Sequence, residues 1–199
     1  MRVALIDAGG ANLGSVRYAL QRLGVEPELT RDADAIRRAD RVILPGVSAA
    51  ATVMRQLHAL ELVDTLRSLR QPLLGVCVGM QLLFEHSEED DTPCLGLLPG
   101  RVRKLEVASD LRVPHMGWSR LQRERDDPLT AGFGDSDYAY FVHSYAAPVT
   151  DACIASAAHG RTFAAVVRQG RIAGAQFHPE RSAATGARLL GNFLLADAA

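Results

Sequence analysis

The 199-residue sequence has few cysteines, no excess of either charge and no long apolar run. Its three cysteines are few and odd in number, which does not suit a disulfide framework, so a reducing cytosol is the expected compartment. The 22 basic and 23 acidic side chains give a formal net charge of −1, without the basic excess that indicates binding to nucleic acid or a membrane surface. The longest mostly apolar stretch, 42–54, contains Pro45 and is shorter than the ~20 residues of a membrane span. We therefore expect small molecules and other proteins as partners.

Signals for targeting, repeats and separate domains are also missing. The N-terminal stretch lacks the successive charged, apolar and cleavage regions of a signal peptide, which again indicates a cytoplasmic protein. No internal repeat, low-complexity segment or long linker divides the chain. Hydrophobic residues make up 48% and charged residues 23% of the sequence, as in a folded globular protein. We expect residues 1–199 to form a single domain.

The first half of the sequence alternates short apolar runs with segments of helical periodicity. The apolar runs predict strands at 2–8, 25–30, 40–46 and 72–77. Apolar residues at helical spacing predict helices at about 12–24, 49–70 and 78–86. Short buried strands that alternate with helices are typical of a parallel sheet covered on both faces. The fold class is therefore α/β, with a mainly parallel, open central sheet flanked by helices.

The second half has a different pattern. Segments 100–107, 137–149 and 162–180 mix polar and apolar residues, which favours additional antiparallel strands. Gln169 and Gly170 suit the turn of a hairpin between two such strands. We expect a last helix over about 182–196 and a surface loop at the acidic segment 87–94.

Cys77 lies in the stretch GVCVGMQLLF (75–84), between two glycines and where a predicted strand gives way to a predicted helix. This is the cysteine counterpart of the Gly-x-Ser-x-Gly nucleophile elbow, in which glycines allow a sharp turn and the approach of a substrate. The dipole of the following helix favours the thiolate, and the Val78 N–H can stabilise an oxyanion. By itself the motif suits an inert buried cysteine equally well.

His178 is the candidate base for this cysteine. It ends an apolar strand in QFHPERS (176–182), with Glu180 two residues later. In an extended chain such residues project to the same side, so Glu180 can orient the imidazole. The alternative is a surface His-Pro-Glu turn, but the two motifs together favour a Cys-His-Glu triad. Cys94 and Cys153 are expected to be structural.

The two motifs resemble those of the class I, or triad, glutamine amidotransferases. Three further stretches, DAGGANLGSV (7–16), VPHMGW (113–118) and YFVHSY (140–145), resemble the glutaminase subunits of imidazole glycerol phosphate synthases. The resemblance implies hydrolysis of L-glutamine to glutamate and ammonia, with no cofactor or metal. It also implies a heterodimer with a cyclase subunit of (βα)8-barrel fold. That cyclase uses the ammonia to make imidazole glycerol phosphate and an aminoimidazole carboxamide ribonucleotide (AICAR) in histidine biosynthesis.

The resemblance also assigns roles to individual residues. The catalytic residues are Cys77, His178 and Glu180; the oxyanion donors are Gly46, Val47 and Val78; the substrate-binding residues are Gln81, Glu89, His143, Ser144 and Tyr145; the partner-interface residues are Asn12, Trp118, Tyr140 and Arg181. A peptide flip at Gly46–Val47 is expected to couple the partner's ligand to glutaminase activity. Ordinary alternatives are an exposed helix position for Gln81, a solvated charge for Glu89 and a core position for Trp118.

The sequence departs from the family pattern at four positions. It has Ala8 in place of Tyr, Ala11 in place of Gly, Ser48 in place of Gly and Ser119 in place of Asn. Because Ser resists positive φ more than Gly does, the ease of the flip next to Ser48 is in question. The other three changes bear on docking and signalling, and none affects the triad.

Three other functions are compatible with parts of the sequence. Glutaminase subunits for pyridoxal phosphate, anthranilate or aminodeoxychorismate synthesis share the triad motifs, but PHMGW and FVHSY favour the histidine pathway. A catalytically inactive binding subunit on the same fold has little support, because all three triad positions are filled. A metal site built from Cys77, His178 and other histidines is disfavoured, because no Cys-x-x-Cys or His-x-x-x-His spacing occurs.

Overall fold

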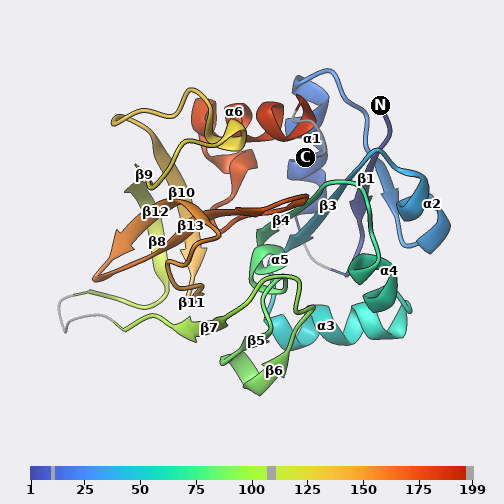
Figure 1. Ribbon diagram of the computed structural model, residues 1–199, viewed down its shortest axis with the longest axis horizontal. Helices are drawn as coiled ribbons and strands as arrows, with labels where there is room; N and C mark the ends of the chain where they lie inside the picture. The colour runs from blue at the N-terminus through green and yellow to red at the C-terminus, as the bar shows by residue number, and fades with distance from the viewer. Residues whose placement is uncertain (10–11, 107–110, 196–199) are drawn as a thin grey trace.

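The computed structural model describes residues 1–9, 12–106 and 111–195. Over these residues, the largest sheet has eight strands in the order β2-β1-β3-β4-β14-β13-β12-β9 (Figure 1). Its parallel half consists of β1 (Val3–Ile6), β2 (Glu28–Thr30), β3 (Arg41–Gly46), β4 (Leu73–Cys77) and β14 (Ile172–Ala175). Its antiparallel half adds β13 (Arg161–Gln169), β12 (Cys153–His159) and β9 (Gln122–Arg123). This arrangement confirms the predicted fold class, including the antiparallel strands contributed by the second half of the chain.

Two smaller sheets adjoin this one in the part of the chain that the structure describes. β8 (His115–Arg120) and β10 (Tyr138–His143) form an antiparallel pair. The other sheet has four strands, in the order β11 (Tyr145–Ala146), β7 (Arg101–Lys104), β5 (His86–Ser87) and β6 (Thr92–Pro93). Strands β10 and β11 follow one another directly, so the two small sheets meet next to His143 and Tyr145.

Helices lie on both faces of the central sheet (Figure 1). α1 (Leu13–Arg22) and α6 (Ala183–Leu195) lie on one face, while α3 (Ala50–Ala59), α4 (Val63–Arg67) and the short α5 (Val78–Gln81) lie on the other. α2 (Ala33–Arg38) contacts α4 and β1. Every residue of β1, β4 and β14 is buried, as expected for strands covered on both faces.

The helices differ from the sequence prediction in extent. The segment 49–70 forms two helices rather than one, because Glu61 adopts a φ of +55° between α3 and α4. The predicted helix over 78–86 ends at Gln81, and His86 and Ser87 form a strand instead. α2 lies outside all the predicted helices, although Asp32 caps its N-terminus.

Two predicted connections have different outcomes. The Gln169–Gly170 turn is confirmed, since Gln169 pairs with Ile172 in the hairpin of β13 and β14. The acidic segment 87–94 is only partly a surface loop, because Ser87 and Cys94 are buried and β6 runs through it. The prediction relied on its acidic residues and missed the pairing of β5 with β6.

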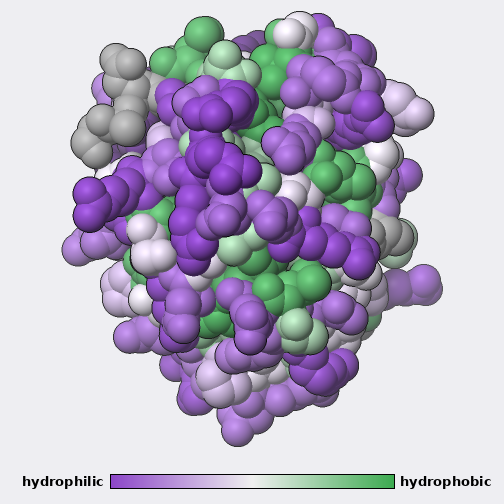
Figure 2. All heavy atoms as spheres, turned by 90° about the vertical axis from the view of Figure 1, so that its right-hand side faces the viewer, coloured by the Kyte–Doolittle hydropathy of each residue, from purple (hydrophilic) through white to green (hydrophobic). Residues whose placement is uncertain are grey.

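The surface is largely polar on the side of the molecule drawn in Figure 2, where small hydrophobic areas lie between hydrophilic side chains. Among the described residues, no helix has both the length and the apolar character needed to cross a bilayer.

Candidate active site

The carboxyl ends of β3, β4 and β14 meet at one edge of the central sheet. These three strands are adjacent and parallel, with Gly46 opposite Cys77 and Ala175 opposite Val76. The chain that leaves β14 therefore reaches His178 beside the end of β4, although His178 and Cys77 are far apart in the sequence. Open α/β sheets bind their ligands at this kind of edge.

Cys77 occupies a strained turn between β4 and α5. Its φ and ψ are 55° and −115°, a conformation that costs an L-residue ~1–3 kcal/mol. A Cβ on Gly79 would lie 1.8 Å from the carbonyl oxygen of Leu44, and a Cβ on Gly75 would lie 2.5 Å from that of Gly79. The positive φ therefore belongs to Cys77 itself, and the flanking glycines serve close packing of α5 against β3 and β4.

The Cys77 side chain lines a pocket, although the residue is only 2% exposed. Its Sγ lies 3.9 Å from the carbonyl oxygen of Val142 and 4.0 Å from Nε2 of Gln176. The other two cysteines are different, because burial raises the pKa of Cys94 and of Cys153 to about 11. Both are free, buried thiols that stay protonated at neutral pH, whereas Cys77 is next to an imidazole.

His178 contacts Glu180, with 2.9 Å between Nδ1 and Oε1. The pair forms in a different way from the one expected, because Pro179–Arg181 is a 3-10 turn, η3, and not extended chain. This turn is packed tightly under α6, since a Cβ on Gly186 would lie 1.9 Å from the carbonyl oxygen of Pro179. The predicted His178–Glu180 pair is therefore present, but a 3-10 turn brings the two side chains together and not the alternation of an extended strand.

Glu180 is also held by Asn12, whose Nδ2 donates to Oε1 at 2.7 Å. Asn12 caps α1 in a left-handed conformation, with φ 78°. The second carboxylate oxygen of Glu180 is buried and has no hydrogen-bond partner among the described residues. Asn12, which the family resemblance implies at the partner interface, thus contacts the carboxylate of the His178–Glu180 pair in this structure.

The charge state of His178 follows from these contacts. Burial disfavours the charged ring, but hydrogen bonds to Cys77 and Glu180, together with the negative charges of both, raise the pKa of His178 to about 10. At neutral pH the ring is therefore an imidazolium held between sulfur and carboxylate. Such a ring is a proton donor for a leaving group and favours the nucleophilic thiolate form of its cysteine neighbour.

Most of the predicted site residues line the same pocket, which has a volume of about 540 Å³. They come from β4, α5, β10, β11 and the connections after β1, β3, β5 and β14. The predicted residues in the lining are Asn12, Val47, Cys77, Val78, Gln81, Glu89, His143, Ser144, Tyr145, His178 and Arg181. Gly46, Glu180, Trp118 and Tyr140 do not line it. Ser48, Ala49, Pro114 and Val142 complete the lining.

Two predicted substrate residues are tied into the fold. Gln81 is 2% exposed, so it is not an ordinary exposed helix residue, and its Nε2 donates to the Tyr145 carbonyl oxygen at 2.8 Å. Glu89 is half-buried and its Oε2 accepts from the backbone N of Ala50 at 2.7 Å, at the start of α3. Glu89 is therefore not a freely solvated charge but a carboxylate fixed at the pocket wall.

His143 is a neutral ring at the junction of β10 and β11. Its Nδ1 lies 2.9 Å from the Tyr145 carbonyl oxygen, and its Nε2 lies 3.2 Å from Nδ1 of His115. Burial lowers the pKa of His143 to about 3, and burial together with the His159 charge lowers the pKa of His115 to about 4. Both imidazoles are therefore uncharged at neutral pH.

Stability in mild acid should depend on these two histidines. Each ring titrates near pH 6.5 in an unfolded chain but stays neutral in the fold down to about pH 4 for His115 and about pH 3 for His143. In this range the unfolded chain binds up to two more protons than the folded chain. The free energy of unfolding should therefore decrease by up to ~2.8 kcal/mol for each unit by which the pH is lowered, between roughly pH 5.5 and 4.5. Urea unfolding at successive pH values measures this slope, and His115→Phe should about halve it. A flat dependence across this range would contradict the buried, neutral pair.

Two of the predicted interface residues, Trp118 and Tyr140, lie on the outward face of the β8–β10 pair, and Arg181 of η3 packs against them. Trp118 is 53% exposed, which makes the core position wrong for it. Trp118 and Tyr140 are paired across the strands with ring centroids 5.9 Å apart, and the Arg181 guanidinium lies 5.4 Å from the Tyr140 ring. Met116 and Tyr138 are also exposed on this face. We call these five side chains the β8–β10 face.

Three of the four departures from the family pattern are within the described residues. Ala8 is buried. Ser48 is not among the described residues with positive φ, so the present loop conformation places no strain on it. Ser119 Oγ lies 3.0 Å from Nε2 of His115. Ala11 lies outside the described residues.

Comparison with known protein families identifies the family to which a chain with this site belongs. The family model described as "Glutamine amidotransferase class-I" matches residues 4–196. The chain belongs to the class-I glutamine amidotransferases. Among curated relatives of this amidotransferase, the "Imidazole glycerol phosphate synthase subunit HisH" of Xylella fastidiosa (strain Temecula1) is 63% identical over 197 residues, which is 99% of this chain and 98% of the relative. The subunit of the same name from Xanthomonas axonopodis pv. citri (strain 306) is 62% identical over 192 residues, 96% of each chain. These relatives confirm the predicted resemblance.

Solved structures show the same fold at much lower sequence identity. A structure described as a glutamine amidotransferase has a TM-score of 0.74 at 23% identity and covers 96% of both chains. The glutaminase domain of CTPS from Trypanosoma brucei, with bound acivicin, has a TM-score of 0.65 at 18% identity and covers 99% of this chain and 95% of that one. At these identities the likeness shows the amidotransferase fold alone.

Gln176 is a site residue that the sequence prediction missed. It is fully buried, and its Oε1 accepts from Nε2 of Gln81 at 3.1 Å while its own Nε2 faces the Cys77 sulfur. A polar residue in the otherwise apolar run IAGAQF was the available signal, because buried polar side chains need partners. Ser182 was missed as well; its Oγ donates to the His178 carbonyl oxygen at 2.7 Å and accepts from the Tyr140 backbone N at 2.9 Å.

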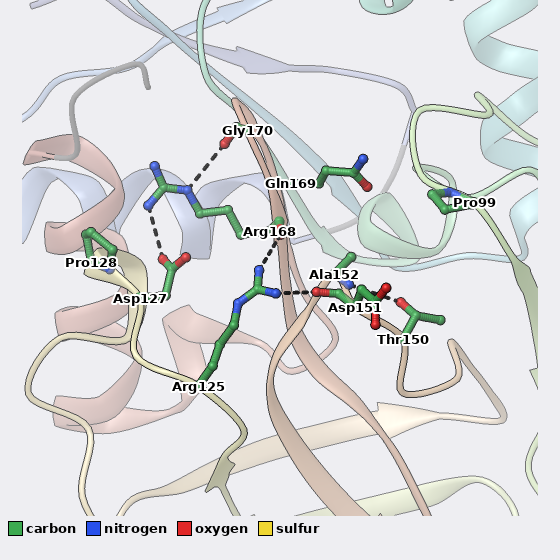
Figure 3. A pocket seen from close by; sticks show the side chains of 10 residues that line it. All are labelled: Pro99, Arg125, Asp127, Pro128, Thr150, Asp151, Ala152, Arg168, Gln169 and Gly170. Carbon is green, nitrogen blue, oxygen red and sulfur yellow. Dashed lines mark hydrogen bonds and ion pairs between the residues drawn. The ribbon is translucent and has the colours of Figure 1, made fainter.

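A second, larger pocket of about 710 Å³ lies at the opposite end of β14, beside the Gln169–Gly170 turn (Figure 3). Its arginines are committed to protein groups, because Arg168 pairs with Asp127 at 3.0 Å and Arg125 donates to backbone carbonyls. None of the predicted site residues lines it. Among the described residues, no three His, Cys, Asp or Glu side chains are grouped so that they could hold a metal ion.

Proposed function

We propose that the chain is the glutaminase subunit of an imidazole glycerol phosphate synthase, which hydrolyses L-glutamine and delivers ammonia to a cyclase subunit. The observation that carries the proposal is the contact of His178 with both Cys77 and Glu180 at the wall of the 540 Å³ pocket. The names of relatives at 60–63% identity over nearly the whole chain support the same pathway assignment.

The first half of the reaction forms a thioester. The Cys77 thiolate attacks the side-chain amide carbon of glutamine, and the carbonyl oxygen becomes an oxyanion. Backbone N–H groups of Val78 and of the Gly46–Val47 segment are the proposed donors to this oxyanion. The tetrahedral intermediate then breaks its C–N bond, and the leaving nitrogen takes the proton of the His178 imidazolium and departs as ammonia.

The second half of the reaction returns the site to its starting state. His178, now neutral, takes a proton from a water molecule whose oxygen attacks the thioester carbon. The second intermediate releases glutamate and regenerates the Cys77 thiolate beside a protonated His178. Glu180 stabilises the imidazolium in both halves, and Asn12 fixes the carboxylate that does so.

The pocket wall provides polar groups for the backbone end of a glutamine substrate. Glu89 and the Gln81 carbonyl oxygen are the proposed acceptors for the α-ammonium group of glutamine, since Nε2 of Gln81 is already bound to Tyr145 and Gln176. Main-chain groups of His143, Ser144 and Tyr145 lie along the same wall and are the proposed contacts for the rest of the glutamine backbone. No cofactor takes part in this scheme.

The β8–β10 face is the proposed docking surface for the cyclase, a (βα)8-barrel that forms a heterodimer with this chain. Exposed Trp, Tyr, Met and Arg side chains are the residue types that concentrate binding energy in interfaces. Asn12 and Arg181 line the pocket close to this face, so a docked partner would cover the site from which ammonia leaves. A covered exit prevents the loss of ammonia to solvent, where it would be protonated.

We expect the whole chain to act as one glutaminase domain in the cytoplasm. The family match spans nearly all of the sequence, and a reducing compartment keeps Cys77 available as a thiolate.

Glutamate release should depend on the partner. We expect little hydrolysis of glutamine by the isolated chain and a large increase when the candidate cyclase and its nucleotide ligand are both present. The assay follows glutamate release and nucleotide turnover in the same mixture. No glutamate in any mixture would overturn the proposed function, whereas full activity of the isolated chain would overturn only the coupling to the partner.

A further inference from the structure

A chain of hydrogen bonds connects β8 with the nucleophile through buried side chains. It starts at Ser119 and passes through His115, His143 and the Tyr145 carbonyl to Gln81. Gln81 continues to Gln176, whose Nε2 faces Cys77 Sγ at 4.0 Å. The distances between the nitrogen and oxygen atoms along the chain are 2.8–3.2 Å.

The direction of every hydrogen bond in the first part of this chain is determined. The Tyr145 carbonyl oxygen can only accept, so His143 must donate from Nδ1 and its Nε2 must be an acceptor. His115 must then donate from Nδ1, which makes its Nε2 an acceptor for the Ser119 hydroxyl. A neutral imidazole has one donor and one acceptor, so the two rings satisfy each other only in these tautomers.

The second part of the chain is oriented by the same Tyr145 carbonyl oxygen. Because the Tyr145 carbonyl accepts, Gln81 presents its Nε2 there and also donates to Oε1 of Gln176. Gln176 consequently presents its Nε2 to the Cys77 sulfur, where an N–H favours the thiolate. If His143 changed tautomer, its Nδ1 lone pair would face the carbonyl oxygen, and the two acceptors would repel each other.

We propose that His115 is a positioning residue for the glutaminase reaction. Together with Ser119 it fixes the tautomer of His143. This tautomer holds the Tyr145 carbonyl in place, and the carbonyl in turn holds the Gln81 and Gln176 amides. The inference rests on the proposed function for its kinetic consequence. His115 itself does not line the pocket and acts only through its neighbours. His115 lies on the inward side of β8, and Trp118 of the proposed docking surface lies on the outward side of the same strand.

His115 also packs against neighbouring rings, and this role can be separated from its hydrogen bonds. Its ring stacks on His159 and Phe141, with centroids 4.2 Å and 5.0 Å apart. His115→Phe keeps an aromatic ring in this stack and removes both hydrogen bonds. His115→Asn loses the stack but keeps an N–H donor near the position of Nδ1. The two variants therefore separate hydrogen bonding from packing.

Kinetics of the complex with the cyclase test the positioning role. We expect His115→Phe to raise the KM for glutamine about tenfold, because the pocket wall at Tyr145 and Gln81 loses its fixed geometry. His115→Asn should recover most of this loss, and His159→Phe, which keeps the ring stack and every hydrogen bond of the chain, should resemble the wild type. A wild-type KM for His115→Phe, or a KM for His115→Asn no better than that of His115→Phe, would overturn the proposal.

Nitrogen NMR of histidine-labelled protein tests the same inference without any activity. At pH 7, His115 and His143 should both be neutral with the proton on Nδ1, and His143 should lose this single state in His115→Phe. His159→Phe keeps the stack and all the hydrogen bonds of the chain, so it should leave both tautomers unchanged. Finding either ring protonated on Nε2 in the wild type would overturn the proposal and leave the proposed glutaminase function intact.

Discussion

Replacing Cys77 with Ala should abolish glutamine-dependent turnover, with a loss of about 10⁴-fold or more. The reason is that the variant has no atom to form the thioester, and triad residues act as a unit whose loss removes nearly all nucleophilic catalysis. Turnover by the cyclase with added ammonium salts should be unchanged, because free ammonia bypasses the sulfur. Both rates are measured on the same preparation of the complex.

Cys94→Ala and Cys153→Ala are the matched controls for this prediction. Both cysteines are buried and free, and burial raises the pKa of each thiol to about 11, so neither is a nucleophile at neutral pH. Both variants should keep glutamine-dependent turnover. Retained turnover in Cys77→Ala, or an equal loss in either control, would contradict the assignment of the nucleophile.

Replacing Gly79 with Ala should both destabilise the fold and disable the site. The new Cβ would lie 1.8 Å from the Leu44 carbonyl oxygen, so α5 must move away from β3. Overpacking of this kind costs up to ~3 kcal/mol, or roughly 10 °C in Tm for a chain of this size. Glutaminase activity should fall with it, because α5 carries Val78 and Gln81 and follows Cys77 directly.

The control for Gly79→Ala is Gly191→Ala in α6. A Cβ on Gly191 meets no atom within 4 Å, and Ala is the better helix former, so this variant should gain ~0.5–1 kcal/mol. Thermal unfolding of both variants gives the comparison. Equal stability of Gly79→Ala and the wild type would show that α5 does not depend on this close approach.

The meeting of Cys77 and His178 could be predicted from their two motifs, although not from the order of the strands. Each lies at or just beyond the end of an apolar run that reads as a buried strand, and parallel strands of an α/β sheet end at the same edge. β14 lies in the half of the chain where antiparallel strands were expected, so its parallel pairing with β4, which brings the two motifs to one edge, was not predicted. The pattern also left open the local path after His178, where a 3-10 turn replaces extended chain.

Other parts of the site depend on contacts that local patterns do not encode. The contact of Asn12 with Glu180 joins the start of α1 to η3, two segments that are 168 residues apart in the sequence and meet only in the folded chain. The hydrogen bonds of Gln176 likewise depend on how α5 packs across β14. α5 itself is shorter than its apolar residues predict, because the residues that follow Gln81 fold back toward β7 as β5.

The most direct measurement of the central claim is to locate the adduct of an electrophilic glutamine analogue by mass spectrometry, in the complex with the cyclase. The position of Cys77 beside a charged His178, at the wall of the 540 Å³ pocket, predicts a single adduct on Cys77 and none on Cys94 or Cys153. An unmodified Cys77 in the presence of the partner, or an adduct on either of the other cysteines, would contradict the account.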